Sequence, residues 1–143
     1  MKFENLMLLE FPSKSVNEGF ARSAVACFAS QMDPTIEEIG DIKTAVSEAV
    51  TNCIVHAYPD GIGRITIRCR ILKGDVLDIV IKDHGVGITD LEKARQPMYT
   101  TGGAERSGMG FTIMETFMTN LRVKSVPGKG TTIHMLRKLN KKR

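Results

Sequence analysis

The chain has 143 residues, and among them are no tryptophan, only two tyrosines and three cysteines. With so few large aromatic rings it offers little stacking surface for single-stranded nucleic acid. The cysteines, Cys27, Cys53 and Cys69, lie far apart and form no CxxC pair. Each falls at an apolar position of its segment, so we expect reduced thiols in the core rather than a metal or redox site.

The sequence also lacks any stretch approaching the roughly 20 apolar residues that span a bilayer. Acidic residues interrupt its apolar start, so we expect no secretion signal and a cytoplasmic protein with no membrane contact. The net charge of +4 reflects a basic tail at 137–143, which holds five of the 20 Lys and Arg residues. Such a tail can contact nucleic acid, but chain ends more often fray into solvent, so we expect no direct nucleic-acid binding.

The length suits one domain over residues 1–143. Two Ser/Thr-x-x-Glu capping boxes, Ser15 with Glu18 and Thr35 with Glu38, predict helix starts. Helical and alternating periodicities, with turn signals between them, predict the remaining boundaries. The expected elements are a strand at 3–11, helices at about 15–31 and 35–57, a hairpin of 63–72 and 76–83, a glycine-rich segment at 85–110 with a short helix near 90–95, a helix at 111–119, and a hairpin of 121–126 and 130–138. Strands segregated from helices favour an α+β two-layer sandwich.

The helix at 35–57 is amphipathic, and its polar side carries Glu48 and Asn52 four residues apart. Residues four apart on a helix point the same way. The ordinary interpretation of such a polar stripe is a face in contact with water. A paired carboxylate and carboxamide also suit a site, so the helix alone leaves both interpretations open.

Asp83 continues the alternation of Leu77, Ile79 and Ile81, which places its carboxylate on the covered face of the predicted strand. A buried carboxylate costs several kcal/mol unless it finds donors. An amino-bearing planar ligand would supply one donor. Capping of the following turn is the alternative, since aspartate often takes that role before glycine.

The stretch RSGMGF, residues 106–111, places two glycines directly before an apolar helix. Backbone N–H groups at a helix start bind anions, and arginine suits phosphate oxygens. A P-loop would need lysine after Gly108, and a dinucleotide fingerprint would need a third glycine where Ile113 stands. Neither pattern matches. Taken together, the helix at 35–57, Asp83 and the 106–111 stretch indicate Mg-ATP as the ligand. Asp83 would offer a carboxylate to an amino-bearing base, Asn52 would bind the cation, and Glu48 would accept a proton.

In this order and spacing EAVTN, DHGVG, RSGMGF and a late GKGTT resemble the N, G1 and G2 boxes and closing threonine of the GHKL ATPase/kinase superfamily. Compact size and a glutamate in the N box are similar to the anti-sigma serine kinases. The further stretches FAR, DPT, SEAVTN, ARQP and ERSGMGFTIME resemble the sporulation anti-sigma-F factors over about residues 3–138.

The resemblance implies a Bergerat fold, a mostly antiparallel mixed sheet covered on one face by helices. It implies an ATP lid at about 97–107, a homodimer that binds ATP or ADP, and two protein partners, a sigma factor and an anti-anti-sigma factor phosphorylated on serine. The implied site residues are Glu48 as catalytic base, Asn52 for Mg²⁺, Asp83, Gly87 and Thr131 near adenine, Arg106, Ser107, Gly108 and Gly110 for phosphates, and Glu18 and Arg22 for the sigma factor. For Glu18 and Arg22 an ordinary helix salt bridge is the alternative.

The lid departs from the family, because TTGGAERS lacks the Lys-Pro expected after the two threonines. No role of a lid lysine is therefore carried over, and the double glycine predicts a looser lid. Two other functions stay open: a stand-alone ATPase in which Glu48 activates water, and a non-catalytic module that uses ATP only to set its shape for partner binding.

Overall fold

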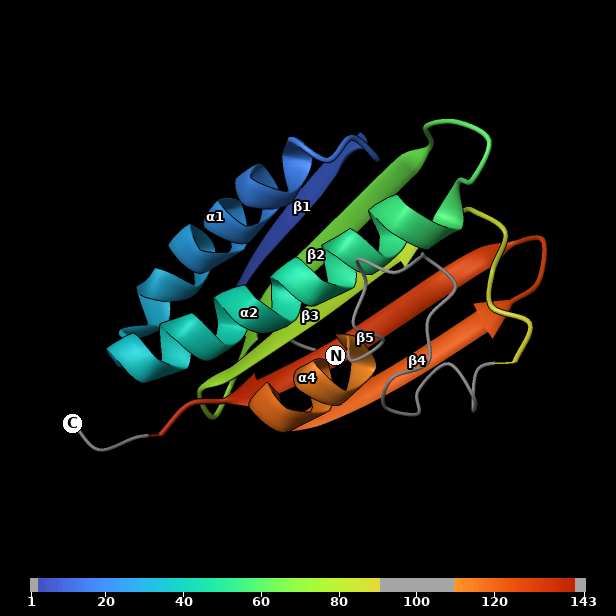
Figure 1. Ribbon diagram of the computed structural model, residues 1–143. Helices are drawn as coiled ribbons and strands as arrows, with labels where there is room; N and C mark the ends of the chain where they lie inside the picture. The colour runs from blue at the N-terminus through green and yellow to red at the C-terminus, as the bar shows by residue number, and fades with distance from the viewer. Residues whose placement is uncertain (1–2, 91–109, 141–143) are drawn as a thin grey trace.

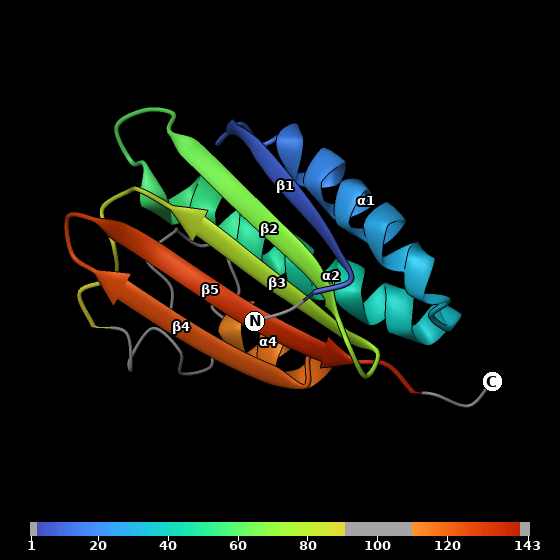
Figure 2. The same cartoon turned by 180° about the vertical axis from the view of Figure 1, so that it is seen from behind.

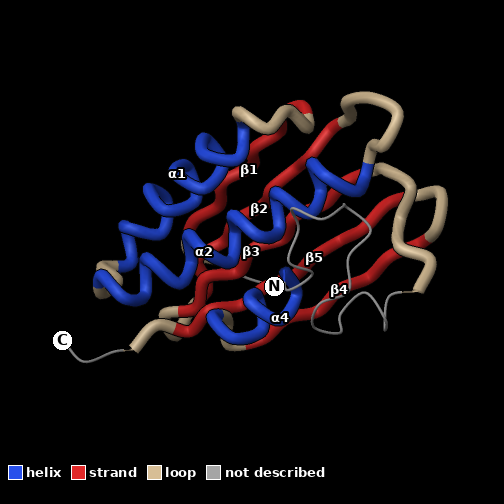
Figure 3. The backbone as a smooth tube through the Cα atoms, in the orientation of Figure 1, coloured by secondary structure: helices blue, strands red, loops and turns tan. Residues whose placement is uncertain are grey.

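The computed structural model describes residues 3–90 and 110–140, which form one five-stranded sheet with helices packed on a single face (Figures 1 and 3). The elements are β1 (Asn5–Pro12), α1 (Asn17–Ala29), the 3₁₀ turn η1 (Ser30–Met32), α2 (Ile36–Asn52), the π-helical turn η2 (Cys53–Ala57), β2 (Arg64–Leu72), β3 (Val76–Asp83), α4 (Gly110–Phe117), β4 (Asn120–Val126) and β5 (Gly130–Lys138). This confirms the α+β two-layer class. Within these ranges no helix is long and apolar enough to cross a membrane.

The strands lie in the order β1-β2-β3-β5-β4, as the view from behind the sheet shows (Figure 2). All four ladders are antiparallel. The described strands therefore contain no parallel pair, which corrects the expected mixed sheet. Strands that follow one another along the chain pair antiparallel, as β1–β2, β2–β3 and β4–β5 do, and β5 also runs antiparallel to β3.

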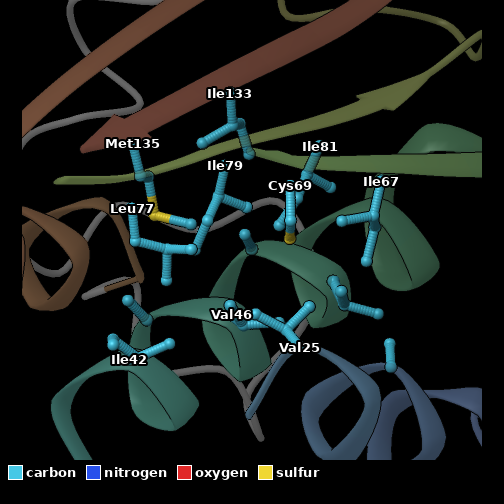
Figure 4. Packing of buried hydrophobic residues seen from close by; sticks show 14 of the residues in the cluster. Val25, Ile42, Val46, Ile67, Cys69, Leu77, Ile79, Ile81, Ile133 and Met135 are labelled. Atoms are coloured by element: carbon cyan, nitrogen blue, oxygen red, sulfur yellow. The ribbon is translucent and has the colours of Figure 1, made fainter. Parts of the chain in front are cut away.

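The core lies between the helices and the covered face of the sheet. Ile42 and Val46 of α2 and Val25 of α1 point toward the side chains of β2, β3 and β5 (Figure 4). The sheet side of this layer includes Phe11, Ile65, Ile67, Cys69, Ile71, Leu77, Ile79, Ile81, Ile133 and Met135. The alternation predicted for β2 and β3 is thus confirmed, and the same alternation fixes which face Asp83 occupies.

The face of the sheet away from the helices, here called the open face, is not wholly exposed to solvent. Asp78 points to this face, yet its side chain is only 1% exposed, because Arg70 bonds it at 2.8 Å and His134 also bonds it. Arg68 lies 3.6 Å away on the same strand as Arg70. The sequence pattern treats Asp78 as solvated, since alternation identifies a face but not the cross-strand partners that cover it.

The two predicted capping boxes have different outcomes. Thr35 accepts from the N–H of Glu38 at 3.0 Å and the Glu38 side chain accepts from the N–H of Thr35 at 2.8 Å, so the box that starts α2 is confirmed. The box predicted at Ser15 is wrong, because α1 begins after Val16 with no side-chain cap. Glu18, its expected partner, bonds Ser47 of α2 instead.

The helical spacing of Phe20, Ala24, Cys27 and Phe28 in the sequence predicts the buried stripe of α1, but the observed stripe is displaced from it. Its buried residues are Ala21, Val25, Phe28 and Ala29. Cys27 is exposed and Phe20 is 52% exposed, although Phe20 keeps an edge contact with Phe11 of β1. Cys27 is therefore not a core thiol, whereas Cys53 and Cys69 are buried as expected. Apolar residues on two faces of one helix left its phase ambiguous in the sequence.

The start of the basic tail is docked rather than frayed, which corrects the expectation for residues 137–140. Arg137 pairs with Asp41 of α2 at 2.8 Å, and the N–H of Asn140 donates to Glu38 at 2.7 Å. Leu139 is buried between them in the chain. The last three basic residues, 141–143, lie outside the described residues.

Candidate functional site

Asp83 ends β3 with its carboxylate on the covered face, 4% exposed. Its Oδ1 accepts from the N–H of Gly85 at 3.0 Å and from the N–H of Thr131 at 3.2 Å. Asp83 therefore caps the turn that follows it, which confirms that interpretation, and it faces the helical layer, while its binding of an amino-bearing ligand stays a prediction. Both backbone bonds go to Oδ1 and leave the lone pairs of Oδ2 out of the cap.

Cys53, the first residue of η2, lies against this carboxylate, and sequence reasoning treated it only as core filler. Burial raises the pKa of the Cys53 thiol well above its ordinary value of 9.0, and the charge and hydrogen bond of Asp83 raise it further. The group is thus a neutral thiol at neutral pH and adds no charge beside Asp83. Its place directly after Asn52 is the signal that could have identified it.

Three glycines allow close backbone packing around Asp83. An ideal Cβ on Gly85 would stand 2.0 Å from the Ala57 carbonyl oxygen, and one on Gly130 would stand 2.2 Å from the Asp83 carbonyl oxygen. Gly87 has φ of +76°, and a Cβ there would stand 2.4 Å from the carbonyl oxygen of Val126. In the structure Gly87 therefore packs on the β4–β5 turn, and its predicted proximity to adenine stays a prediction.

Thr131 is buried beside Asp83, where sequence analysis expected it, and its hydroxyl lies 2.8 Å from that of Ser125. Ser125 in turn accepts from the N–H of Ile88 at 2.7 Å. Ser125 was missed by sequence reasoning. The register of the closing hairpin pairs it with Thr131, so the turn at PGKG could have revealed it.

Glu48 and Asn52 lie half-buried on the last turns of α2, next to η2. An ideal Cβ on Gly110, the first residue of α4, would stand 3.5 Å from Oε1 of Glu48. The structure thus brings the predicted catalytic carboxylate to the N-terminal end of α4, the end that favours anions. Arg106, Ser107, Gly108 and the rest of the predicted lid lie outside the described residues.

Glu18 and Arg22 form the predicted pair on α1, with Arg22 Nη1 3.2 Å from Glu18 Oε2. The same Glu18 oxygen accepts from the Ser47 hydroxyl at 2.6 Å. A groove of about 440 Å³ runs between α1 and α2, lined by Arg22, Ser23, Gly40, Lys43, Thr44, Ser47 and Glu48. Arg22, one member of the predicted sigma-contacting pair, and the predicted catalytic residue Glu48 therefore border one groove.

The residues present fit a magnesium ion shared with phosphates rather than one held by protein alone. Among the described residues no group of three or more His, Cys, Asp or Glu could hold a metal. Asn52 offers one amide oxygen, and magnesium commonly takes one or two protein oxygens together with phosphate oxygens and waters. Asn52 alone would be a poor site for any ion without a phosphate ligand.

Comparison with known proteins shows the family to which the chain belongs. The model of the histidine kinase-like ATPase domain matches residues 11–137. Proteins named anti-sigma F factor are similar along nearly the whole chain: one from Caldanaerobacter subterraneus subsp. tengcongensis is 59% identical over 144 residues, covering 100% of both chains. Another, from Thermoanaerobacter sp. (strain X514), is 60% identical over 136 residues, 94% of each.

Solved structures agree in fold. The RsbU and RsbW domains of Rv1364c from Mycobacterium tuberculosis match with a TM-score of 0.69 at 16% identity, over 94% of this chain and 32% of that chain. The histidine kinase domain of the Erythrobacter litoralis EL346 blue-light activated histidine kinase matches with a TM-score of 0.60 at 22% identity, over 85% and 61%. At these identities the likeness concerns the fold alone.

Proposed function

Since the chain belongs to the histidine kinase-like ATPase domain family and, within it, to the anti-sigma F factors, we propose that it binds a sigma factor and phosphorylates a serine of an anti-anti-sigma factor with Mg-ATP. It acts in the cytoplasm as a nucleotide-bound homodimer that controls sporulation transcription. The observation that carries the kinase assignment is the placement of Glu48 against Gly110, at the anion-favouring end of α4.

The adenine end of the site is built on Asp83. Oδ1 is held by two backbone N–H groups, so the carboxylate orientation is set before a ligand arrives. Oδ2 accepts a hydrogen bond from the exocyclic amino group of adenine. Thr131 of the neighbouring strand β5 lies beside Asp83, and its hydroxyl contacts that of Ser125 on β4. A preset acceptor of this kind rejects bases that present an acceptor at the same place.

The chemical end is built on α2. Glu48 accepts the proton of the substrate serine hydroxyl, the serine oxygen bonds to the γ-phosphorus, and the bond from that phosphorus to the β-bridging oxygen breaks to release ADP. Asn52 would contribute an oxygen to Mg²⁺, and the bound ion would neutralise phosphate charge. Phosphoryl transfer depends chiefly on positioning and charge stabilisation, and the N-terminal end of α4 supplies both beside Glu48.

Transfer of labelled γ-phosphate from ATP to a purified anti-anti-sigma protein tests this function. We expect label on a serine, and we expect Glu48→Gln to bind ATP normally while losing transfer by about 100-fold or more, the usual contribution of a positioned base. Glu37→Gln, an exposed change in the first turn of the same helix, is the matched control and keeps full transfer.

Two outcomes would contradict the proposal. Label that reaches the partner at an undiminished rate in Glu48→Gln would remove Glu48 as the base. Free phosphate released without any protein partner, with none transferred to one, would identify a stand-alone ATPase instead.

A further inference from the structure

The loop after Asp83 is fastened to the end of the helix that carries Glu48 and Asn52. The N–H of Val86 donates to the carbonyl oxygen of Ala57 at 2.9 Å. Gly85 packs against the same carbonyl so closely that no side chain fits between them. The last residue of η2 and the loop that follows β3 are therefore in direct backbone contact. We call this contact of Ala57 with Gly85 and Val86 the joint.

Tyr58 adds two hydrogen bonds at the same joint. Its hydroxyl donates to the carbonyl oxygen of Arg64 at 2.6 Å and accepts from the N–H of His84 at 2.7 Å. His84 directly follows Asp83, and Arg64 begins β2. One hydroxyl group thus connects the residue after η2, the start of β2 and the residue after the predicted adenine ligand.

Packing holds the ring in place for this bond. An ideal Cβ on Gly63 would stand 2.1 Å from Cε1 of Tyr58, so the ring lies flush on a backbone that has no side chain. Burial, together with the nearby Asp83 and Cys53, raises the pKa of Tyr58 above its ordinary value of 10.0 in spite of its backbone hydrogen bonds. The hydroxyl therefore keeps the proton that it donates to Arg64.

The joint has a geometric consequence for a ligand that reaches both ends of the site. Asp83 lies on the sheet side of the joint, whereas Glu48 and Asn52 lie on the helix side, separated from it by the π-helical turn η2. Such turns are less regular than an α-helix and occur often at functional sites. Contacts across the joint therefore act together with the core packing of α2 in fixing how far the two ends stand apart.

We infer that Tyr58 is a positioning residue that sets the spacing between the adenine carboxylate Asp83 and the phosphate end at Glu48 and Asn52. The inference rests on the proposed function, because it assumes that ATP spans these two ends. Tyr58 itself touches neither end in the role assigned to it and acts through the backbone of His84.

The test compares a ligand that spans the joint with one that does not. Tyr58→Phe keeps the ring and removes the hydroxyl with both of its hydrogen bonds. Because the bond from His84 is the one that reaches the adenine end, we expect the dissociation constant of Mg-ATP to rise about fivefold, the typical effect of one hydrogen bond. We expect that of adenosine to change less than twofold. Both constants are measured by calorimetry on the same preparation, so any unfolded fraction cancels in their ratio.

Two further variants sharpen the comparison. Gly63→Ala places a methyl group against the Tyr58 ring and should also lower the ratio of ATP affinity to adenosine affinity. This second variant keeps the test available if Tyr58→Phe fails to fold. Ser30→Ala removes a hydroxyl that donates to the Ala26 carbonyl oxygen at 2.9 Å, remote from the joint. This matched control should leave the ratio unchanged.

The outcomes separate the inference from the proposed function. Equal losses for ATP and adenosine, or no loss for either, would overturn the spacing role of Tyr58 while Asp83 could still bind adenine. If Asp83→Asn left both affinities unchanged, the adenine site itself would be wrong, and the proposed function would fail whatever Tyr58→Phe did.

Discussion

Single residues at this site serve the fold and the proposed ligand at once. Asp83 is buried, and two backbone N–H groups at 3.0 and 3.2 Å offset part of the cost of burying its charge. Gly85 and Gly130 let those N–H groups come close enough, since a side chain on either would collide with backbone. The acceptor that we assign to adenine is therefore held rigidly by groups that the fold needs in any case.

Asp83→Asn tests the adenine end. The amide can present an NH₂ group where the amino group of adenine needs an acceptor, so we expect Mg-ATP affinity by calorimetry to fall at least tenfold, as for the loss of a charged hydrogen bond. Asp78→Asn is the control on the opposite face of the same strand. It should lower the unfolding midpoint and leave the ATP dissociation constant unchanged; equal ATP affinities in the two variants would count against the adenine assignment.

Among the elements, α2 carries the proposed catalytic and cation-binding residues and is fixed at both ends. At its start the Thr35–Glu38 box and the docked tail meet, because Glu38 accepts from the N–H groups of Thr35 and Asn140 with its two oxygens. At its end η2 joins it to the loop after β3. Such anchoring would hold the two proposed site residues, Glu48 and Asn52, in a fixed position.

Thr35→Ala should remove the side-chain half of the box. We expect the free energy of unfolding in urea to fall by about 1 kcal/mol, the usual effect of losing a helix cap. Thr44→Ala, at an exposed position in the middle of the same helix, should instead be neutral or slightly stabilising, because alanine is the better helix former. A loss of the same size in both variants would show that the cap itself contributes nothing.

At the scale of the whole molecule, two buried carboxylates make stability depend on pH. For Glu38, burial acts to raise the pKa, but the backbone bonds from Asn140 and Thr35 outweigh it and hold the pKa below its ordinary 4.5. For Asp78, burial is likewise outweighed by bonds from His134 and Arg70, which hold the pKa below 3.8. The folded state thus binds these protons less readily than the unfolded chain.

The sign follows from linkage. The stabilisation is complete above about pH 5 and is lost as the pH falls through 4.5 and 3.8 toward the lowered values of the folded state. Urea unfolding at pH 7, 5 and 4 should show this loss, and Glu38→Gln should show a lower stability at pH 7 with a smaller further loss by pH 4. Glu37→Gln should keep the wild-type profile; a Glu38→Gln profile parallel to wild type would contradict the assignment.

The sequence was informative wherever one periodicity acted alone. Alternation in β2 and β3 predicted the covered face and hence the burial of Asp83, and the Thr35 box predicted the start of α2. Where two patterns competed it failed: α1 has apolar residues on two sides, so Cys27 and Phe20 were placed in the core. Contacts between distant segments, such as Ser47 with Glu18 or Arg137 with Asp41, leave no local pattern and needed the structure.

The residues of the candidate site likewise fall into those that the sequence predicted and those that it missed. Motif spacing and the family resemblance predicted site roles for Glu48, Asn52, Asp83 and Thr131, and these roles stay predictions, although the structure places Glu48 beside Gly110 and Thr131 beside Asp83. Cys53, Tyr58 and Ser125 were missed, because each acts through a partner in another element. Arg106, Ser107 and Gly108 remain predictions from the sequence.

Cys27, which the sequence wrongly predicted to lie in the core, has a practical use. Of the three thiols only Cys27 faces solvent, while Cys53 and Cys69 are enclosed and their pKa values are raised, that of Cys69 to about 12. A maleimide dye can therefore be attached to the native chain at one defined point, without engineering. That point lies on the helix that bears Glu18 and Arg22, so the natural sequence already carries an attachment site for a fluorescent reporter of docking.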